Sequence, residues 1–448
     1  MDMLSGNLLK KMIIFTLPII FSSILQLLYN AVDLAVLGQY CGDKSLSAVG
    51  STGSLTNLII NLFMGVSIGA NVAVARAIGQ KDDQKIKRLV HTSILFAIFS
   101  GIFLSIFGIF TASIWLELMG TNQEYLDLAT LYLQIYFGGM IFNMVYNFGA
   151  AILRAVGETR KPLYFLGIAG LANVALNYLL VLAFHMDVAG VAIGTIVSQG
   201  ISAVLVIGCL IRRKGSIHFS FKSLGIDGKC LKEMIFIGLP AGIQGTLFSI
   251  SNVFIQSAVN SFDSASVVAG NTAASNIEGF VYAAMNAFYQ ACITFTSQNL
   301  GAKKISNCKK ALLHALLCVT ITGIAFGGMA LLFDESLLKI YTNTPESIAV
   351  GRKRLLIICS TYFTCGIMDV FVGGLRGLGY SIVPMAVSIM GACVFRLIWI
   401  FTAFQASHTL DTLYISYPIS WVVTALVHMC CYIFVYKRTI KKYIPEAI

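Results

Sequence analysis

The sequence predicts an all-α integral membrane protein whose twelve transmembrane helices form two six-helix lobes related by pseudo-twofold symmetry. The prediction depends on the composition, on a series of long apolar runs and on an internal repeat. Of the 448 residues, 57% are hydrophobic and only 11% are charged, whereas a soluble domain carries about 25% charged residues. The composition therefore excludes an ordinary soluble protein.

The apolar runs account for the individual helices. A hydrocarbon core about 30 Å thick is crossed by about 20 apolar residues in a helix. Runs of at least this length occur twelve times along the chain, at residues 12–39, 45–78, 89–116, 126–152, 162–184, 188–211, 233–259, 266–299, 311–333, 347–375, 383–405 and 412–436. Because these runs are long and continuously apolar, rather than short and alternating, they favour helices over the strands of a barrel.

An internal repeat divides the chain into two halves. A shift of 222 residues places Pro18 on Pro240, and it also aligns LRAVGETRKP at 153–162 with LRGLGYSIVP at 375–384. We therefore expect an N-terminal lobe at 1–211, a cytoplasmic linker loop at 212–231 and a C-terminal lobe at 232–448. Each lobe has an even number of spans, so the repeats have the same orientation and a pseudo-twofold axis along the membrane normal.

The formal net charge of +11 reflects membrane topology and not a surface for nucleic acid. With the N-terminus in the cytoplasm, the inner segments hold 25 of the 31 basic residues. Arg396 lies within a span, and the outer segments hold the remaining five: Lys44, Lys339, Arg352, Lys353 and Arg354. This bias follows the positive-inside rule. We expect a multi-pass protein of the cell's inner (plasma) membrane with both termini in the cytoplasm.

The sequence lacks signals for catalysis or for a bound cofactor. It contains neither an HExxH pattern nor a Walker A pattern, which would provide a zinc site or a phosphate-binding loop. The eleven cysteines form no CxxC pair and lie mostly in predicted helices, where cysteine is a small packing residue. We therefore expect no enzyme, and no cofactor other than Na⁺ or H⁺ as a transported coupling ion.

The first span has an unusual polar face. Gln26, Tyr29, Asn30 and Asp33 are spaced at zero, three, four and seven residues, so they lie on one side of a helix. A charge near the bilayer centre costs at least about 2.5 kcal/mol, and such residues usually line a cavity or an ion path. The polar face is therefore expected to point away from lipid, although a purely structural role for any single acid stays open.

Other polar residues of the N-terminal lobe are predicted to lie at a similar depth. With 1.5 Å of rise per residue, Asp33 and Thr195 lie roughly 10 Å below the outer face and Asn177 roughly 12 Å below it. Asn173 lies one helical turn from Asn177 on the same face. A carboxylate, two amide oxygens and a hydroxyl are suited to Na⁺ or to an exchangeable proton. Asp33, Asn173, Asn177 and Thr195 are thus the candidate cation-coupling residues and could hold Na⁺.

The C-terminal lobe has different intramembrane charges. Residue 255, which the repeat sets opposite Asp33, is isoleucine. Glu278, Asp369 and Arg396 lie within spans instead, and Asp369 stands opposite Asn147 in the repeat. Arg396 is long enough to form a salt bridge with either acid. Whether this group stabilises the lobe or faces substrate is left open.

The chain resembles the multidrug and toxic compound extrusion (MATE) family of secondary transporters over nearly its whole length. The similar segments are LP at 17–18, VDLAVLG at 32–38, GANVAVARAIGQKD at 69–82, LRAVGETRKP at 153–162, GVAIGTIVSQ at 190–199, GLP at 238–240, SQNLGAKK at 297–304 and LRGLG at 375–379. The resemblance implies a V-shaped bundle that exports organic cations in exchange for Na⁺ or H⁺, and hence multidrug efflux and antibiotic resistance.

The resemblance also implies a cation site in the N-terminal lobe. The family builds it from an Asp of helix 1, an Asn and an Asp of helix 5 and a Thr of helix 6, which match Asp33, Asn173, Asn177 and Thr195. Gln26 and Tyr29 match polar residues beside that site. Position 177 is Asn where some relatives carry a second Asp. Phe248 and Cys365 stand where another branch of the family has acids in the C-terminal lobe.

The substrates implied are small, mostly cationic amphiphilic molecules, and the expected partners are the lipid bilayer and no nucleic acid, with the protein a monomer. The nearest alternative is a flippase for a lipid-linked saccharide from the same wider superfamily. Such flippases often have additional spans and a cationic central cavity, whereas this chain has twelve spans and Arg396 is the only basic residue expected within the membrane.

Overall fold

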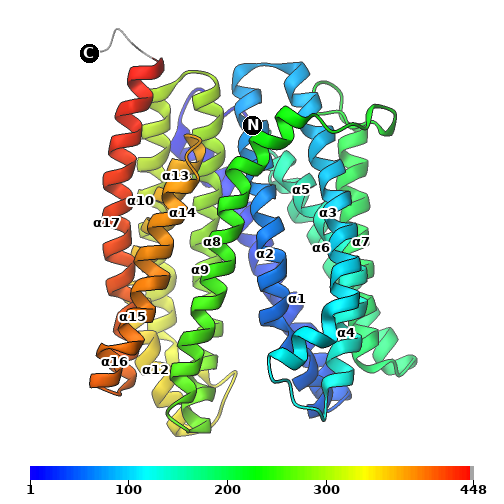
Figure 1. The fold of residues 1–448 in the computed structure, drawn as a ribbon, viewed down its shortest axis with the longest axis vertical. Coiled ribbons are helices and arrows are strands. Elements are labelled where there is room, and N and C mark those ends of the chain that lie inside the picture. The colour runs from blue at the N-terminus through cyan, green and yellow to red at the C-terminus, as the bar shows by residue number, and fades with distance from the viewer. Residues whose placement is uncertain (444–448) are drawn as a thin grey trace. The chain divides into compact units, whose positions relative to one another are not determined.

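The computed structural model describes residues 1–443, and this range contains helices and no β-strand (Figure 1). The end of the predicted C-terminal lobe, 444–448, lies outside the described residues. The chain forms two compact units. The first consists of Met1 and residues 21–242, and the second consists of residues 2–20 together with the chain from Ile243 onward.

The helices follow one another with short connections. Those before the linker are α1 (Leu8–Tyr40), α2 (Asp43–Gln80), α3 (Asp83–Leu118), α4 (Leu126–Gly138), α5 (Met140–Ala155), α6 (Arg160–Tyr178), the π-helix η1 (Leu179–Ala183) and α7 (Asp187–Arg212). The linker contains the short 3₁₀ helix η2 (Phe221–Ser223). The helices after it are α8 (Gly228–Asn260), α9 (Ala265–Gly301), α10 (Ile305–Leu332), α11 (Asp334–Leu338), α12 (Pro345–Cys359), α13 (Tyr362–Gly377), α14 (Ile382–Ser388), the π-helix η3 (Ile389–Val394), α15 (Phe395–Phe401), α16 (Ala403–Ala406) and α17 (Leu410–Tyr443).

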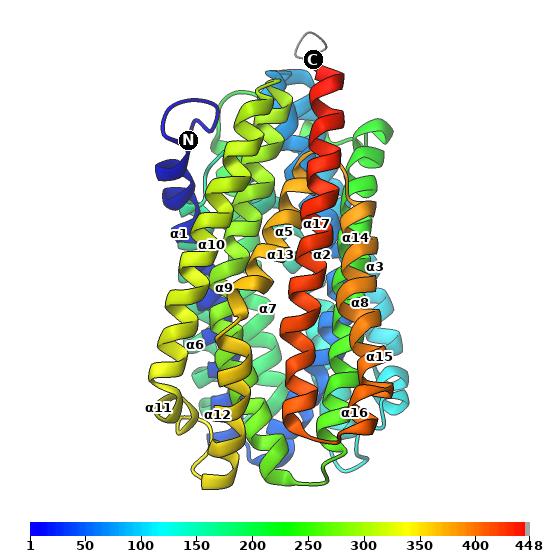
Figure 2. The ribbon, with the colours of Figure 1, turned by 90° about the vertical axis from the view of Figure 1, so that its left-hand side faces the viewer.

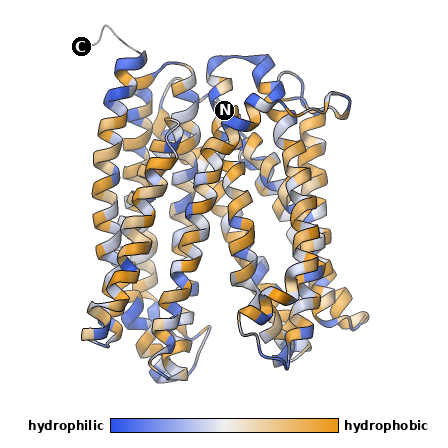
Figure 3. Ribbon diagram, in the orientation of Figure 1, coloured by the Kyte–Doolittle hydropathy of each residue, from blue (hydrophilic) through white to orange (hydrophobic). Residues whose placement is uncertain are grey.

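These helices confirm the predicted spans. Within the described residues, nine helices are long and apolar enough to cross a membrane, and the bent pairs α4–α5 and α12–α13 bring the number to eleven. The remaining predicted run, 266–299, corresponds to α9. This helix is as long as the others, but polar residues such as Asn271, Glu278 and Gln290 make it less apolar. In each unit, hydrophobic residues cover the middle of the helices, and hydrophilic residues gather near their ends (Figure 3).

The two bent pairs repeat one another along the chain. The chain bends by 48° between α4 and α5, at Gly139, and by 46° between α12 and α13. The second break contains Thr361, which lies 222 residues after Gly139 (361 minus 139). The internal repeat of the sequence is therefore visible in local structure, because the same kind of break recurs at corresponding positions.

Glycines bring α2 and the first half of α8 into direct backbone contact in the first unit. A Cβ on Gly65 would overlap the backbone of Gly242, and a Cβ on Gly69 would overlap the carbonyl oxygen of Met234. Gly65 and Gly69 form a GxxxG pattern, as Gly238 and Gly242 do, and this pattern allows helices to approach closely in membranes. The start of α8 therefore packs with the first unit.

The boundaries of the two compact units differ here from the lobe boundaries expected from the sequence. Residues 232–242 were expected in the C-terminal lobe and residues 2–20 in the N-terminal lobe, but the first of these segments belongs to the first unit and the other to the second unit. The physical reason in the first case is the glycine contact with α2, which depends on close packing and not on chain order. α1 and α8 are each divided between the units two residues after an internal proline, Pro18 and Pro240.

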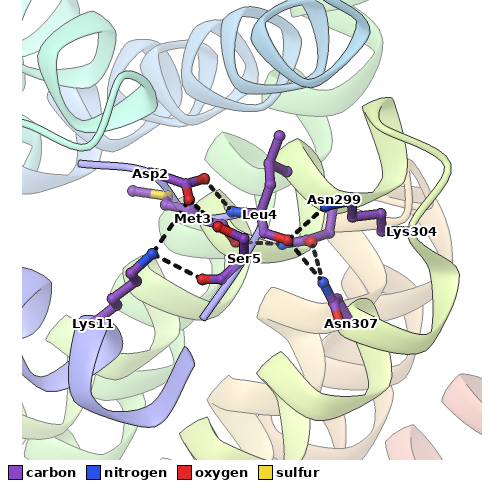
Figure 4. A network of polar contacts seen from close by, with 8 residues as sticks. All are labelled: Asp2, Met3, Leu4, Ser5, Lys11, Asn299, Lys304 and Asn307. Carbon is purple, nitrogen blue, oxygen red and sulfur yellow. Dashed lines mark hydrogen bonds and ion pairs between the residues drawn. The ribbon is translucent and has the colours of Figure 1, made fainter. Parts of the chain in front are cut away.

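The N-terminal segment is held by hydrogen bonds in the second unit. α9, α10, α13 and α17 are neighbours there (Figure 2). Asn299 donates to the carbonyl oxygen of Met3 at 3.0 Å, and Lys304 donates to that of Leu4 at 2.9 Å. The complete network consists of Asp2, Met3, Leu4, Ser5, Lys11, Asn299, Lys304 and Asn307 (Figure 4). Hydrogen bonds from Ser5 and from the Leu4 amide, and the nearby Lys11, lower the pKa of Asp2 to about 2.

The linker between α7 and α8 packs against α3. The Phe219 side chain is fully buried and stacks on His91, with ring centroids 5.3 Å apart. The backbone amide of Ser220 donates to Nε2 of His91, and the amide of Asp227 donates to the Thr92 hydroxyl. These contacts give the predicted linker loop a defined position on the first unit.

Candidate functional site

A single buried carboxylate in the first unit is held by side chains of two other helices. Asp33 lies on α1 and is 6% exposed. Its Oδ1 accepts a hydrogen bond of 2.5 Å from the Asn177 amide on α6. Its Oδ2 accepts one of 3.1 Å from the Thr195 hydroxyl on α7. The structure thus brings together residues that the sequence placed only at similar depth.

Asn173 completes the cluster. Its amide lies 3.5 Å from the Thr195 hydroxyl, and its Oδ1 accepts a hydrogen bond of 3.4 Å from the Asn177 amide. Asn173 and Asn177 are four residues apart on α6, so one face of that helix presents both amides. Immediately beyond them, α6 passes into the π-helix η1 at Leu179. π-Helical segments of this kind often occur at functional sites.

One oxygen of the cluster has no partner. Oδ1 of Asn177 is buried and accepts no hydrogen bond from any described residue. This oxygen lies against the backbone of α7, because a Cβ on Gly194 would overlap it. A buried polar atom without a partner is costly, and a cation at Asp33 would provide a partner if the amide turned this oxygen toward the carboxylate. Two carboxylate oxygens, two amide oxygens and one hydroxyl form a set of hard oxygen ligands suited to Na⁺.

The carboxylate faces a polar cavity of about 300 Å³. Six of its lining residues were predicted near the site: Gln26, Tyr29, Asn30, Asn147, Asn173 and Thr195. Asn177 lies behind Asp33, fully buried and outside the lining. Among the described residues that line the cavity, Asp33 is the only charged side chain. The cavity is therefore negative whenever Asp33 is ionised.

Sequence reasoning missed a second polar face that lines this cavity. Ser198, Gln199 and Ser202 of α7 line it together with Thr195, and so do Asn57 of α2 and Asn143 of α5. The four α7 residues are spaced at zero, three, four and seven, the same pattern that singled out the polar face of α1. The same helical-period test would have found them.

Tyr29 is positioned by a glycine on α6. Its hydroxyl donates a hydrogen bond of 2.9 Å to the carbonyl oxygen of Leu166. A Cβ on Gly170 would overlap the Tyr29 ring. The ring therefore lies directly on the α6 backbone, one turn before Asn173. Tyr29 belongs to the wall of the cavity and does not contact Asp33 by any hydrogen bond between described residues.

The charges of the second unit do not form the predicted network. Glu278 is paired with Arg354 at 2.7 Å, and not with Arg396, whose length would also have allowed that salt bridge. Arg396 makes no ion pair with a described residue. Its Nε donates to the Ser420 hydroxyl at 3.0 Å, and its guanidinium lies over the Tyr417 ring at 4.2 Å.

Arg354, which the charge distribution assigned to an outer segment, is buried in the second unit. It is 4% exposed, and its guanidinium contacts both carboxylate oxygens of Glu278 and the side-chain oxygen of Asn271. The periodicity of α12 indicates the reason, since Ser347, Gly351, Arg354 and Ile358 share its buried face. This geometry favours the lobe-stabilising alternative for Glu278, because a doubly hydrogen-bonded buried pair leaves little for substrate to contact.

Asp369 is separate from that pair. It lies on α13 and interacts with the Tyr282 hydroxyl on α9 and, by charge, with Arg376. Arg376 in turn hydrogen-bonds Gln244 at 2.8 Å and the Tyr289 hydroxyl. Cys365, one turn before Asp369, is buried. The second unit therefore contains a carboxylate surrounded by hydroxyl and amide groups, but no cluster that matches the one around Asp33 among the described residues.

Comparisons with known proteins agree with this architecture. The family model described as MatE matches the chain twice, over residues 18–179 and 240–402. The two matches begin 222 residues apart (240 minus 18), which is the offset of the internal repeat. A solved structure, titled as the outward-facing conformation of a multidrug resistance MATE family transporter of the MOP superfamily, matches with a TM-score of 0.91 at 20% identity and covers 98% of both chains.

Curated relatives cover nearly the whole chain as well. YpnP of Bacillus subtilis, described as a probable multidrug resistance protein, is 25% identical over 395 residues, which are 88% of each chain. YoeA of the same bacterium has the same description and is 26% identical over 444 residues, 96% of this chain and 94% of that protein.

Proposed function

Since this chain belongs to the MatE family of multidrug and toxic compound extrusion transporters, we propose that it exports small cationic organic molecules by alternating access in exchange for Na⁺ or H⁺. It is a multi-pass membrane protein and a transporter, not an enzyme. The observation behind the mechanism is that Asp33 is the only charged side chain among the described residues of a polar cavity. Coupling ion and substrate would both compete for this carboxylate.

The competition provides the coupling. An ionised Asp33 attracts a cationic substrate, whereas Na⁺ or H⁺ at Asp33 neutralises the cavity and weakens that attraction. Because binding is reciprocal, the substrate weakens ion binding to the same extent. A transporter that must release one ligand before it binds the other exchanges the two across the membrane.

The donors around Asp33 support such an exchange. The hydrogen bonds from Asn177 and Thr195 stabilise the carboxylate while no ion is bound. For Na⁺, the Asn177 amide would turn to present its oxygen, and the Asn173 and Thr195 oxygens would complete the ligands. For H⁺, the protonated carboxyl would itself donate to a neighbouring oxygen. Both alternatives leave the site without net charge.

We also propose that both termini and the linker loop are cytoplasmic, in the plasma membrane. The motivation is the concentration of basic residues near one side of the spans. A cysteine introduced at Ser223, which is exposed in the linker, should react with a membrane-impermeant thiol reagent only after the cells are opened. Labelling from outside intact cells would overturn the proposal.

The proposed function is tested by dye efflux in a host that lacks its own drug pumps. Cells producing this protein should extrude a cationic dye, and dissipating the Na⁺ or H⁺ gradient should stop the extrusion. In proteoliposomes, the same protein should exchange dye for the ion without moving a fluorescent lipid-linked saccharide between leaflets. Saccharide movement without dye efflux would favour the flippase alternative.

A further inference from the structure

A second cavity lies apart from the Asp33 site, between the start of α6 and the end of α7. We call it the α6–α7 groove. Its volume is about 450 Å³, and none of its lining residues lines the Asp33 cavity. Lys161 is in the first turn of α6, and Arg212 is the last residue of α7. The two side chains therefore reach the cavity from the same end of the helix pair.

The cationic groups of this groove are not all neutralised by the protein. Arg213 forms a salt bridge of 2.8 Å with Glu158. Lys161 and Arg212 form no ion pair or side-chain hydrogen bond with any described residue. No acidic residue is among the described residues that line the groove. The groove therefore presents two uncompensated positive charges.

Below the charges, the groove has an apolar wall that runs along the spans. Val204, Gly208 and Arg212 are four residues apart on α7, so they lie on one face of that helix. Val204 is 69% exposed although it lies within a spanning helix. A Cβ on Gly208 would have no atom within 4 Å, so the glycine leaves the groove open. Phe165, one turn after Lys161 on α6, forms part of the opposite wall.

We propose that this groove binds an anionic phospholipid, with its phosphate between Lys161 and Arg212 and an acyl chain along Val204 and Gly208. Basic pockets between spanning helices on the cytoplasmic side are suited to anionic head groups. A zwitterionic lipid would place its own positive group beside the two cations. A free phosphate compound would use the charges but not the apolar wall.

A lipid in this groove would contact the two helices whose side chains hydrogen-bond Asp33. α6 supplies Asn173 and Asn177, and α7 supplies Thr195. A lipid seated between the ends of α6 and α7 contacts both helices and so favours their packed arrangement. The proposal is independent of the coupling ion and of the substrate.

Native mass spectrometry of the full-length protein in a neutral detergent tests the proposal. Dioleoyl phosphatidylglycerol should bind about tenfold or more tightly than dioleoyl phosphatidylcholine. The double variant Lys161→Gln/Arg212→Gln should weaken phosphatidylglycerol binding about 30-fold, since each cation near a membrane surface contributes about fivefold. The matched variant Lys214→Gln/Lys222→Gln removes two exposed cations outside the groove and should change binding less than about twofold.

A further variant separates a lipid from a free phosphate compound. Gly208→Leu fills the apolar groove and leaves both cations, so it should weaken phosphatidylglycerol binding, and glycerol 3-phosphate should not compete with the lipid. Equal binding of the two lipids, or unchanged binding by the Lys161/Arg212 double variant, would overturn the proposal. Efficient competition by glycerol 3-phosphate without an effect of Gly208→Leu would also overturn it, and would assign the groove to a free phosphate compound. Unchanged melting temperatures confirm that the variants are folded.

Discussion

The side-chain amide of Asn177 donates a hydrogen bond of 2.5 Å to Oδ1 of Asp33, and it joins residues that are 144 positions apart. The contact ties the polar face of α1 to α6, while Thr195 ties the other carboxylate oxygen to α7. An ion that replaces these donors therefore changes the contacts of three helices at once.

Replacing Asp33 with Asn should abolish ion-coupled efflux while the protein stays folded. The amide has the shape of the carboxylate and can still accept from Asn177, but it has no charge for an ion or a cationic dye to neutralise. Dye efflux and the melting temperature of the purified variant provide the two readouts. Normal efflux by a well-expressed Asp33→Asn protein would remove the coupling role, and loss of the protein from the membrane would favour a structural one.

Exchange for a monovalent dye should be electrically neutral, because the N-terminal site has one carboxylate. Each charge that crosses the field is worth about 2.3 kcal/mol per 100 mV. A potassium–valinomycin potential without an ion gradient should therefore drive no dye accumulation in proteoliposomes. The variant Asn177→Asp tests the same argument. Its second carboxylate would bind a second cation, so exchange for a monovalent dye would move net charge and should be driven by voltage. Voltage-driven accumulation by the unmodified protein would point to a second ion, with Asp369 of the second unit as the candidate site.

Tyr29 should influence which dyes are exported, and much less whether coupling occurs. Gly170→Val pushes the ring away from α6, because even a Cβ there overlaps it, and it should alter the apparent KM for dyes by different factors. Tyr29→Phe keeps the ring and loses one hydrogen bond, worth about 1 kcal/mol, so its effect should be smaller. The ion dependence of efflux should be unchanged in both variants. If Tyr29→Phe abolished coupling, the tyrosine would belong to the ion site.

Breaking the Glu278–Arg354 pair should destabilise the protein without changing ion coupling. Removal of one partner from a buried pair costs about 3–5 kcal/mol, so Glu278→Gln should lower the melting temperature and the yield. The fraction that folds should export dye with the normal ion dependence, the opposite of the pattern expected for Asp33→Asn. Loss of coupling in a Glu278→Gln protein of normal stability would instead make Glu278 part of the transport mechanism.

Enlarging a glycine at the contact between α2 and α8 should separate these helices. Gly69→Leu places a branched side chain against the Met234 backbone, and overpacking of this kind costs about 1–3 kcal/mol or more. The matched variant Gly50→Leu lies on the same helix, where a Cβ meets nothing within 4 Å, and should cost less than about 0.5 kcal/mol. Melting temperatures in detergent compare the two, and equal values would contradict the packing argument.

Sequence patterns predicted the elements well because those patterns are local. A span is recognised by its length and composition, and the twelve runs fall on the helices or bent helix pairs of the structure. The repeat offset predicted corresponding elements in the two halves. The polar face of α1 followed from spacing alone, since helical periodicity decides which side chains share a side. The depth of a residue along its span could also be predicted from the sequence, because it depends only on the rise per residue.

Only the tertiary structure decided which faces meet. Spacing and depth leave the rotation of each helix and the choice of its neighbours undetermined, so the sequence could group Asp33 with Asn177 and Thr195 but could not show the hydrogen bonds between them. For the same reason the sequence allowed Arg396 to pair with either Glu278 or Asp369, whereas Arg354 on α12 is the residue that pairs with Glu278. The start of α8 packs on α2 through glycine contacts that no run of residues reveals by itself. The close packing of all helices in a unit determines which side chains meet across helices, and this packing exists only in the three-dimensional structure.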